Sequence, residues 1–379
     1  MMIKCVKDIL KDDFWIMPAT PEYIEKGIPY ITSKNIKNGK IDFSKVNYIS
    51  QESFDKISKN RPILNGDILI SMIGTLGETA EVTVNDGVFY GQNMFLVRLD
   101  ESKVDKRYFL NYFKSNYVKR ALAEKQNQST QKYLKANHIE DLYIPVPMVE
   151  QQRNVACVLD KISEMINFRK QQLQQLDELV KARFVELFGE VATNAKRFPM
   201  KRMDECCKFI GGAQPNKSHF EYKKTDDNIR LIQIRDYKSD KFITYIPKEL
   251  ARKTCTATDI MIGRYGPPIF QILSGIEGAY NVALMKAIPT DEFNLEYFRC
   301  FLKDEKLLHY LESFSQRTAG QDGIQIDKLN EYPCFVPPID LQNEFADFVK
   351  QIEKSKVVVQ KALDEAQTLF DSLMQEYFG

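Results

Sequence analysis

Residues 147–152 read Pro-Met-Val-Glu-Gln-Gln, and 190 positions later residues 337–342 read Pro-Pro-Ile-Asp-Leu-Gln. The first proline, an aliphatic side chain, an acid and the last glutamine fall in register. The likeness continues at this offset for more than 40 residues and closes on Glu-Leu-Phe-Gly at 186–189 and Glu-Tyr-Phe-Gly at 376–379. A repeat of this length takes precedence over local propensities, so we expect one structural unit to occur twice.

Both copies carry apolar side chains at alternating spacings of four and three residues. Of ten such positions, 8 are apolar in the first copy and 9 in the second, although the whole chain is only 44% apolar. A 3.5-residue period kept over nearly five heptads is typical of a coiled-coil seam. The apolar seam positions are Val155, Leu159, Ile162, Ile166, Leu173, Leu176, Val180 and Leu187, and then Phe345, Val349, Ile352, Val359, Leu363, Ala366, Phe370, Leu373 and Tyr377.

These segments predict two long helices, each with a seam of roughly 50 Å at about 1.5 Å per residue. If they pair antiparallel, they form a rod of fixed length. The alternative is two ordinary amphipathic helices, each packed on its own domain. A register that pairs Val155 with Tyr377 places Lys356 near Leu176. Three charges interrupt the seam, at Arg169, Arg183 and Lys356. They either fix the register, or face a partner, or extend past the core to water.

Composition indicates a protein of two ordinary domains without a membrane segment. The net charge of +1 over 379 residues hides a division, because residues 1–142 and 191–333 each carry +3 while the helical segments 143–190 and 334–379 carry −1 and −4. Seven scattered cysteines without C-x-x-C spacing predict reduced thiols and a cytoplasmic location. We read the pair Cys206-Cys207 as buried filler.

Residues 1–142 predict a mixed α/β domain. Strands are expected at 28–32, at 67–71 before the glycines of 74–77, and at 91–97. A helix is expected over 105–123, and its aromatic stripe indicates a core face rather than a platform for bases. A loop at 125–133, rich in amides and hydroxyls, follows.

Residues 191–333 keep this order of elements while their loop residues differ. The strand at 259–263 corresponds to the one at 67–71, the segment 281–286 to 93–98, and the loop at 316–321 to the amide-rich loop. The fold class is therefore α+β. Two similar mixed α/β domains alternate with two long helices, with pseudo-twofold symmetry.

Catalytic motifs are missing from the local sequence. Neither a G-x-x-x-x-G-K-[ST] loop nor a G-x-G-x-x-G loop occurs. Gly266-Pro267-Pro268-Ile269 lacks the amide or acid of the Asn/Asp-Pro-Pro-aromatic loop of amino-methyltransferases. The three histidines are dispersed, and no metal site is predicted. The chain thus reads as a binding protein and not an enzyme.

The doubled pattern resembles the DNA-specificity subunit of type I restriction–modification enzymes. The residues that carry the resemblance are 65–71 with 74–77, 129–132 and 144–152 in the first copy, and 209–212 with Pro215, 259–262 and 336–342 in the second. It covers essentially the whole chain. Departures occur at 257–259, where Ala-Thr-Asp replaces Asn-Gly-Asp, and at 17–21, which lacks the paired glycines.

The resemblance implies a function and partners. Residues 1–142 and 191–333 would be target-recognition domains, each reading one half of a split site on double-stranded DNA. Residues 143–190 and 334–379 would be spacer helices in an antiparallel coiled coil, which docks two methylation subunits. Restriction (translocase) subunits would join these. The chain itself would hold no cofactor, because S-adenosylmethionine belongs to the methylation subunits. The alternatives are a coiled-coil scaffold without a DNA role and a methyltransferase with its own recognition domain.

Residues for DNA contact are chosen by chemistry, since amides pair with adenine and arginine or lysine with guanine, while other cations contact phosphates. In the first domain we expect Lys34, Asn35, Ser71, Thr75, Gln128, Ser129, Thr130, Gln131 and Lys132. In the second we expect Lys217, Arg235, Arg264, Tyr265, Gln316, Arg317, Thr318 and Gln321.

Overall fold

A computed structural model describes residues 2–17, 21–37, 39–74, 76–127, 133–191, 193–266, 268–314 and 323–379. Contacts divide the chain into two compact units. Unit 1 comprises Met1–Gln171 and Gln360–Gly379, and unit 2 comprises Gln172–Val359. Each unit thus contains one globular domain and one half of each long helix. The four predicted segments, with boundaries at 142/143, 190/191 and 333/334, remain a prediction.

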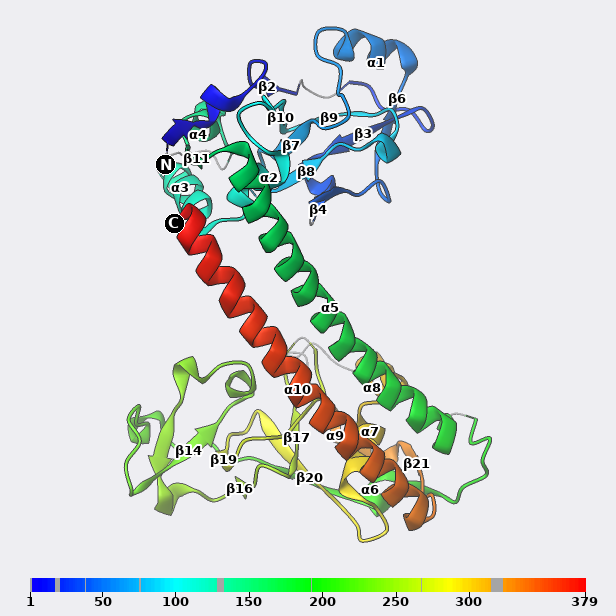
Figure 1. Ribbon diagram of the computed structural model, residues 1–379. Helices are drawn as coiled ribbons and strands as arrows, with labels where there is room; N and C mark the ends of the chain where they lie inside the picture. The colour runs from blue at the N-terminus through cyan, green and yellow to red at the C-terminus, as the bar shows by residue number, and fades with distance from the viewer. Residues whose placement is uncertain are drawn as a thin grey trace. The chain divides into compact units, whose positions relative to one another are not determined.

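Unit 1 is built on two small sheets with a shared core (Figure 1). The first is antiparallel and has the order β2 (Trp15–Ile16), β10 (Met94–Val97), β7 (Ile68–Ser71), β8 (Thr79–Glu81). The second has the order β6 (Asn47–Ile49), β3 (Ile28–Thr32), β9 (Tyr90–Gln92), in which β3 and β9 are parallel. Short pairs join β4 (Ile36–Lys37) to β5 (Lys40–Ile41) and β1 (Met2–Cys5) to β11 (Tyr143–Val146).

The helices of unit 1 are α1 (Gln51–Ser58), α2 (Lys106–Phe113), α3 (Asn116–Asn127) and α4 (Ala136–Glu140). The aromatic stripe of α2 is core, as predicted, because Tyr108, Phe109 and Tyr112 are fully buried. They pack in one cluster with Leu159 of the long helix α5 (Val149–Phe188) and Phe378 of the long helix α10 (Ile339–Phe378). The globular domain of unit 1 is therefore joined to the helix pair through a continuous hydrophobic core.

Two elements of unit 1 differ from the predictions. The helix expected over 105–123 is two helices, α2 and α3, because the chain turns at Lys114–Ser115 and the Ser115 hydroxyl accepts a hydrogen bond from the Val118 N–H at 3.3 Å. The strand expected over 91–97 is split into β9 and β10, because Asn93 adopts a positive φ of 60°. Asparagine tolerates this left-handed conformation better than most residues. The split sends β9 and β10 into different sheets.

Unit 2 repeats the architecture. One sheet has the order β13 (Cys207–Gly211), β20 (Leu284–Pro289), β17 (Ile260–Gly263), β18 (Gln271–Leu273), and the other β15 (Tyr245–Pro247), β14 (Asn228–Ile232), β19 (Gly278–Tyr280), β16 (Thr254–Cys255). Strands β14 and β19 are parallel, as β3 and β9 are. Strand β12 (Met200–Arg202) pairs with β21 (Pro333–Phe335). The helices are α6 (Met203–Cys206), α7 (Leu295–Leu302), α8 (Glu305–Ser313) and α9 (Ile326–Glu331), and both Cys206 and Cys207 are buried.

Helices α5 and α10 pack antiparallel. In unit 1 the start of α5 shares a core with the end of α10. In unit 2 the ring centre of Phe188, the last residue of α5, lies 5.5 Å from the ring centre of Phe345, near the start of α10. The structure describes every predicted seam position, and each is buried or half-buried. Lys356 forms an ion pair of 2.6 Å with Asp177, next to Leu176, as the predicted register requires. None of the described helices is both long and apolar enough to cross a membrane.

Candidate nucleic-acid interface

Four segments of unit 1 meet where strand β7 ends. The Met72 N–H donates to the Asn93 carbonyl at 3.1 Å, and the Met72 carbonyl accepts from the Leu134 N–H at 3.0 Å. The Asn93 carbonyl also accepts from the Ser33 hydroxyl, which belongs to the 3-10 turn Ser33–Asn35. The turn after β7, the corner between β9 and β10, the turn after β3 and the residues that follow the amide-rich loop therefore lie together.

Unit 2 builds the same junction with equivalent backbone hydrogen bonds. The Arg264 N–H donates to the Ala283 carbonyl at 2.9 Å, and the Arg264 carbonyl accepts from the Ile324 N–H at 3.2 Å. Gly212, after β13, donates its N–H to the Leu284 carbonyl at 3.0 Å, just as Met17, after β2, donates to Met94 at 3.0 Å. The backbone is thus repeated, while Met72 of unit 1 is replaced by Arg264 of unit 2.

A charge pair supports the start of the central strand in each unit, and it is buried at Asp67 in unit 1 and half-buried at Asp259 in unit 2. Asp67 is 1% exposed, and its carboxylate accepts from Arg98 Nε at 2.7 Å and Nη2 at 2.8 Å, which raises the pKa of Arg98. In unit 2, Asp259 pairs with Lys286 at 2.7 Å. Burial opposes the ionisation of Asp259, but hydrogen bonds from Lys286 and Thr256 outweigh it and lower the pKa of Asp259. These pairs hold the strand in front of the junction.

Two predicted cations occupy equivalent positions. Lys34 lies in the turn after β3, and Arg235 lies in the corresponding 3-10 turn Ile234–Tyr237 after β14. The turns are closed in the same way, since the Thr32 N–H donates to the Asn35 side chain at 2.9 Å and the Gln233 N–H to Asp236 at 3.0 Å. Both Lys34 and Arg235 are exposed. Each unit therefore presents one cation from the turn that borders the junction.

The structure corrects the role expected of two polar residues. Asn35 is 7% exposed, and its amide nitrogen donates to the carbonyls of Asp42 at 2.8 Å and Lys45 at 3.0 Å. Ser71 is 1% exposed in β7, and its hydroxyl accepts from the Glu78 N–H at 3.0 Å. Their polar groups hold the loops in shape and face away from solvent, so we no longer place them among the side chains that contact bases.

Arg264 and Tyr265 lie within the unit 2 junction, as Arg264 stands directly after β17 and Tyr265 bridges to Gly323. The guanidinium lies 5.3 Å from the centre of the Tyr265 ring, and its Nη1 donates to the Val282 carbonyl at 3.4 Å. Among the described residues, the buried Nε of Arg264 has no hydrogen-bond partner.

Lys217 is exposed on the short turn Lys217–His219. The remaining candidates, Thr75, Gln128, Ser129, Thr130, Gln131, Lys132, Gln316, Arg317, Thr318 and Gln321, lie outside the described residues.

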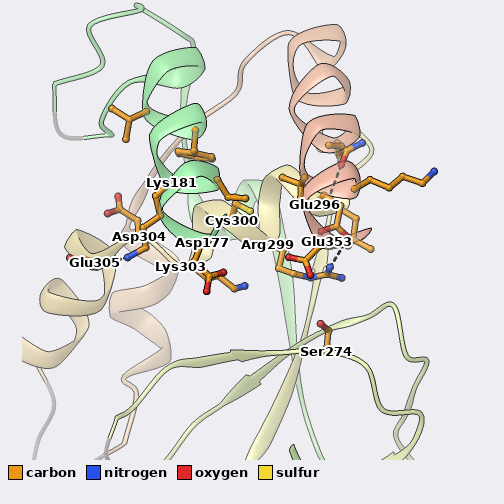
Figure 2. A pocket seen from close by; sticks show the side chains of 18 of the residues that line it. Asp177, Lys181, Ser274, Glu296, Arg299, Cys300, Lys303, Asp304, Glu305 and Glu353 are labelled. Atoms are coloured by element: carbon orange, nitrogen blue, oxygen red, sulfur yellow. Dashed lines mark hydrogen bonds and ion pairs between the residues drawn. The ribbon is translucent and has the colours of Figure 1, made fainter. Parts of the chain in front are cut away.

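A separate groove of about 1380 Å³ lies in unit 2 between the end of α5, the α7–α8 region and the start of α10 (Figure 2). Its charges pair with one another, as in Lys181–Glu305 at 2.9 Å, Lys306–Glu190 at 2.5 Å and Arg299–Glu296 at 2.6 Å. In the described parts of the chain, no cluster of His, Cys, Asp and Glu side chains could hold a metal ion.

Comparisons with known proteins agree with this doubled architecture. A family model described as the type I restriction modification DNA specificity domain matches residues 5–178. The putative type I restriction enzyme MjaX specificity subunit of Methanocaldococcus jannaschii is 26% identical over 61% of this chain and 58% of that protein. The EcoKI specificity subunit of Escherichia coli K12 is 19% identical over 92% of this chain and 80% of that protein. The chain thus spans little more than half of the MjaX subunit, and it spans 39% of the related MjaVIII subunit.

Solved structures share the fold over the full chain. The type I restriction–modification S subunit from M. genitalium has a TM-score of 0.58 at 13% identity and covers 100% of this chain and 96% of its own. A structure concerning complex assembly and conformational transition of the type I R-M system has a TM-score of 0.54 at 16% identity, covering 100% and 97%. Over residues 5–178 the chain is therefore similar to type I DNA specificity domains, and over its full length it has the fold of a solved type I S subunit.

The structure adds two features that sequence reasoning missed. Phe242 is 58% exposed, and the cationic groups of Arg235 and Lys241 lie 5.7 and 5.4 Å from its ring centre. A basic and aromatic cluster of this kind suits a nucleic-acid surface, and the adjacent Lys241-Phe242 was its only sequence signal. Gln152 and Gln342 are each fully buried where the long helices begin, and their exact repetition was the signal for them.

Proposed function

We propose that this chain is the DNA-specificity subunit of a type I restriction–modification enzyme, and that its two units read the two halves of a split site on double-stranded DNA. The supporting observation is the pair of junctions, which share their backbone hydrogen bonds but present Met72 and Ile73 in unit 1 and Arg264 and Tyr265 in unit 2. One fold with two different surfaces is what a protein needs to recognise two different base sequences.

The side chains that we assign to each junction are suited to contact the bases and phosphates of DNA. Arg264 can donate to the acceptor edge of a guanine in the major groove, because its guanidinium offers several N–H groups in one plane. Lys34, Lys217, Arg235 and Lys241 are exposed cations suited to phosphates, which fix the protein on the duplex without reading sequence. The polar segments 128–132 and 316–321, which lie outside the described residues, carry the amides expected to read adenine.

The proposal includes partners for the long helices. Besides the seam, they expose large apolar side chains, which are Val158, Met165, Phe168, Leu179 and Val185 on α5 and Val357, Val358 and Leu369 on α10. Exposed apolar side chains along both helices are candidates for contact with other proteins. We assign them to two methylation subunits, which would supply S-adenosylmethionine and the catalytic residues, and to restriction subunits that join these. The chain itself would act without catalysis, in the cytoplasm.

The test replaces Arg264 by alanine in the chain assembled with its methylation subunits. We expect the affinity for the DNA site to fall by about tenfold, as is typical for loss of a base-reading side chain. Discrimination should relax in one half of the site only, which methylation of DNA libraries randomised in each half would show. Lys248→Ala, at another exposed cation of unit 2, is the matched control. Equal loss of discrimination in both halves, or no difference from the control, would argue against the proposal.

A further inference from the structure

A buried glutamine holds the connection between each recognition domain and its long helix. Gln152 and Gln342 have no exposed surface and lie in the first turn of α5 and α10. A fully buried amide is uncommon and needs its donors and acceptor satisfied inside the protein. Both side chains meet that need through backbone groups alone.

The three hydrogen bonds of Gln152 join three different segments of unit 1. Its Oε1 accepts from the Asp105 N–H at 2.8 Å, and its Nε2 donates to the carbonyls of Lys103 at 3.0 Å and Pro147 at 2.8 Å. Asp105 is the N-cap of α2, whose aromatic face fills the core, and Pro147 lies in the turn from β11 into α5. One side chain therefore ties the domain helix to the long helix.

Gln342 reproduces this arrangement in unit 2. Its Oε1 accepts from the Asn294 N–H at 2.8 Å, and its Nε2 donates to the carbonyls of Glu292 at 2.9 Å and Pro337 at 2.8 Å. Asn294 is the N-cap of α7, the counterpart of α2. The distances differ from those of Gln152 by no more than 0.1 Å.

A tyrosine adds a second repeated tie at the same place. Tyr108, in the first turn of α2, donates its hydroxyl to the Pro145 carbonyl at 2.9 Å, and Tyr297 of α7 donates to the Phe335 carbonyl at 3.4 Å. Both acceptors lie in the strand that leads into the long helix. A connection held by several hydrogen bonds around one domain helix has little freedom to rotate or bend.

We infer that Gln152 and Gln342 are positioning residues that fix the orientation of each recognition domain on its long helix and so restrict the spacing between the two halves of the DNA site. This inference rests on the proposed function. If one domain could tilt on its helix, sites with an altered spacer would be accepted, because rigid linkage is what makes the second contact depend on distance.

The test uses Gln152→Glu and Gln342→Glu in the full chain assembled with its methylation subunits. Glutamate keeps the volume and the Oε1 acceptor but has at most one O–H donor in place of the two N–H groups of the amide, so at least one of the two donated hydrogen bonds is lost. The substrates are the wild-type site, found by mapping methylation, and the same site with the spacer lengthened or shortened by one base pair. Gln175→Ala, an exposed position of α5, is the control.

The quantity measured is the ratio of methylation rates on the native and altered spacers. Since both rates come from one preparation, a loss of folded protein cancels, and Gln342→Met provides a second variant with a neutral side chain. We expect the preference for the native spacer to fall by about tenfold, the effect of releasing a buried hydrogen-bonded group.

An unchanged spacer preference in all of these variants would overturn the inference and leave the proposed function intact. A wild-type complex that methylates no split site would instead overturn the proposed function, and the inference with it.

Discussion

At the residue scale, the two units solve one problem with different chemistry at equivalent positions 35 and 236. Asn35 satisfies its amide with three backbone groups, whereas Asp236 places a carboxylate in the same turn at 4% exposure. Its Oδ2 accepts from the Gln233 N–H, but Oδ1 accepts no hydrogen bond from the described residues. Arg230 and Arg235 stand at 3.8 and 3.9 Å, so they offset the burial only in part.

Burial raises the pKa of Asp236, against the opposing effects of the Gln233 N–H and the two arginines. A raised native pKa means that the group favours folding below its unfolded pKa and that this contribution is lost as the pH rises. We therefore expect Asp236→Asn to stabilise the turn by about 1 kcal/mol at pH 7. The difference should shrink as the pH falls toward 4, because protonation removes more of the charge from Asp236.

Hydrogen exchange of residues 228–237 at pH 7 and pH 4, corrected for intrinsic rates, measures the difference in local stability between Asp236→Asn and the wild-type chain. A local measurement is needed because a two-unit chain does not unfold in a single step. Faster exchange in the variant at pH 7 would show that the ion pairs with Arg230 and Arg235 outweigh the burial. Sequence alone could not make this prediction, nor exclude Asn35 and Ser71 from the DNA contacts. The burial of a polar side chain depends on neighbours far along the chain.

At the element scale, the resemblance implied that the long helices pair antiparallel, and the heptad pattern and the repeat were sufficient to predict both helices and the order of the expected strands. They were not sufficient at Asn93 and Ser115, where one positive φ and one capping hydroxyl divide an expected strand and an expected helix. Periodicity reports which face is buried, and α2 and α3 keep an apolar face in spite of the break between them. Local turns of this kind leave no trace in a hydrophobic pattern.

Lys356 is the residue that most directly tests the register between the two long helices. Hydrogen bonds to Asp177 at 2.6 Å and Glu353 at 2.7 Å raise its pKa although burial lowers it, so the charge is kept within the seam. We expect Lys356→Leu to raise the melting temperature, because leucine suits a seam position, but to weaken the preference for one register.

Cysteines placed at Leu173 and Val359 report the register in unit 2, since the predicted pairing sets them side by side. We expect their cross-linking yield to fall in Lys356→Leu and not in Lys354→Leu, at an exposed position of the same helix. If the yield and the assembly with methylation subunits are both unchanged, the side chain merely extends to water and the register is set by the apolar residues.

At the scale of the whole molecule, the repeat of 190 residues extends to single interactions. The pairs Asp67–Arg98 and Asp259–Lys286, the glutamines 152 and 342, and the backbone bonds at the two junctions all recur. What differs is concentrated in the side chains at the junctions. Sequence reasoning identified this division but not the contacting atoms, because the corresponding loops of the two copies differ in their residues, so neither loop predicts the contacts of the other.

The proposed function requires that the two units read DNA independently. A scaffold without a DNA role would have no reason to vary the junctions, and a methyltransferase would need a cofactor loop that the sequence does not show. A chain that binds S-adenosylmethionine on its own would support the methyltransferase.

The most direct measurement maps adenine methylation across the genome of a host that expresses this chain with its methylation subunit, before and after residues 1–142 are exchanged for those of a relative. We expect a split motif in which one half changes and the other half and its methylation stay the same. A motif that changes in both halves, or the absence of any split methylated motif in a host shown to express both proteins, would contradict the two-reader account.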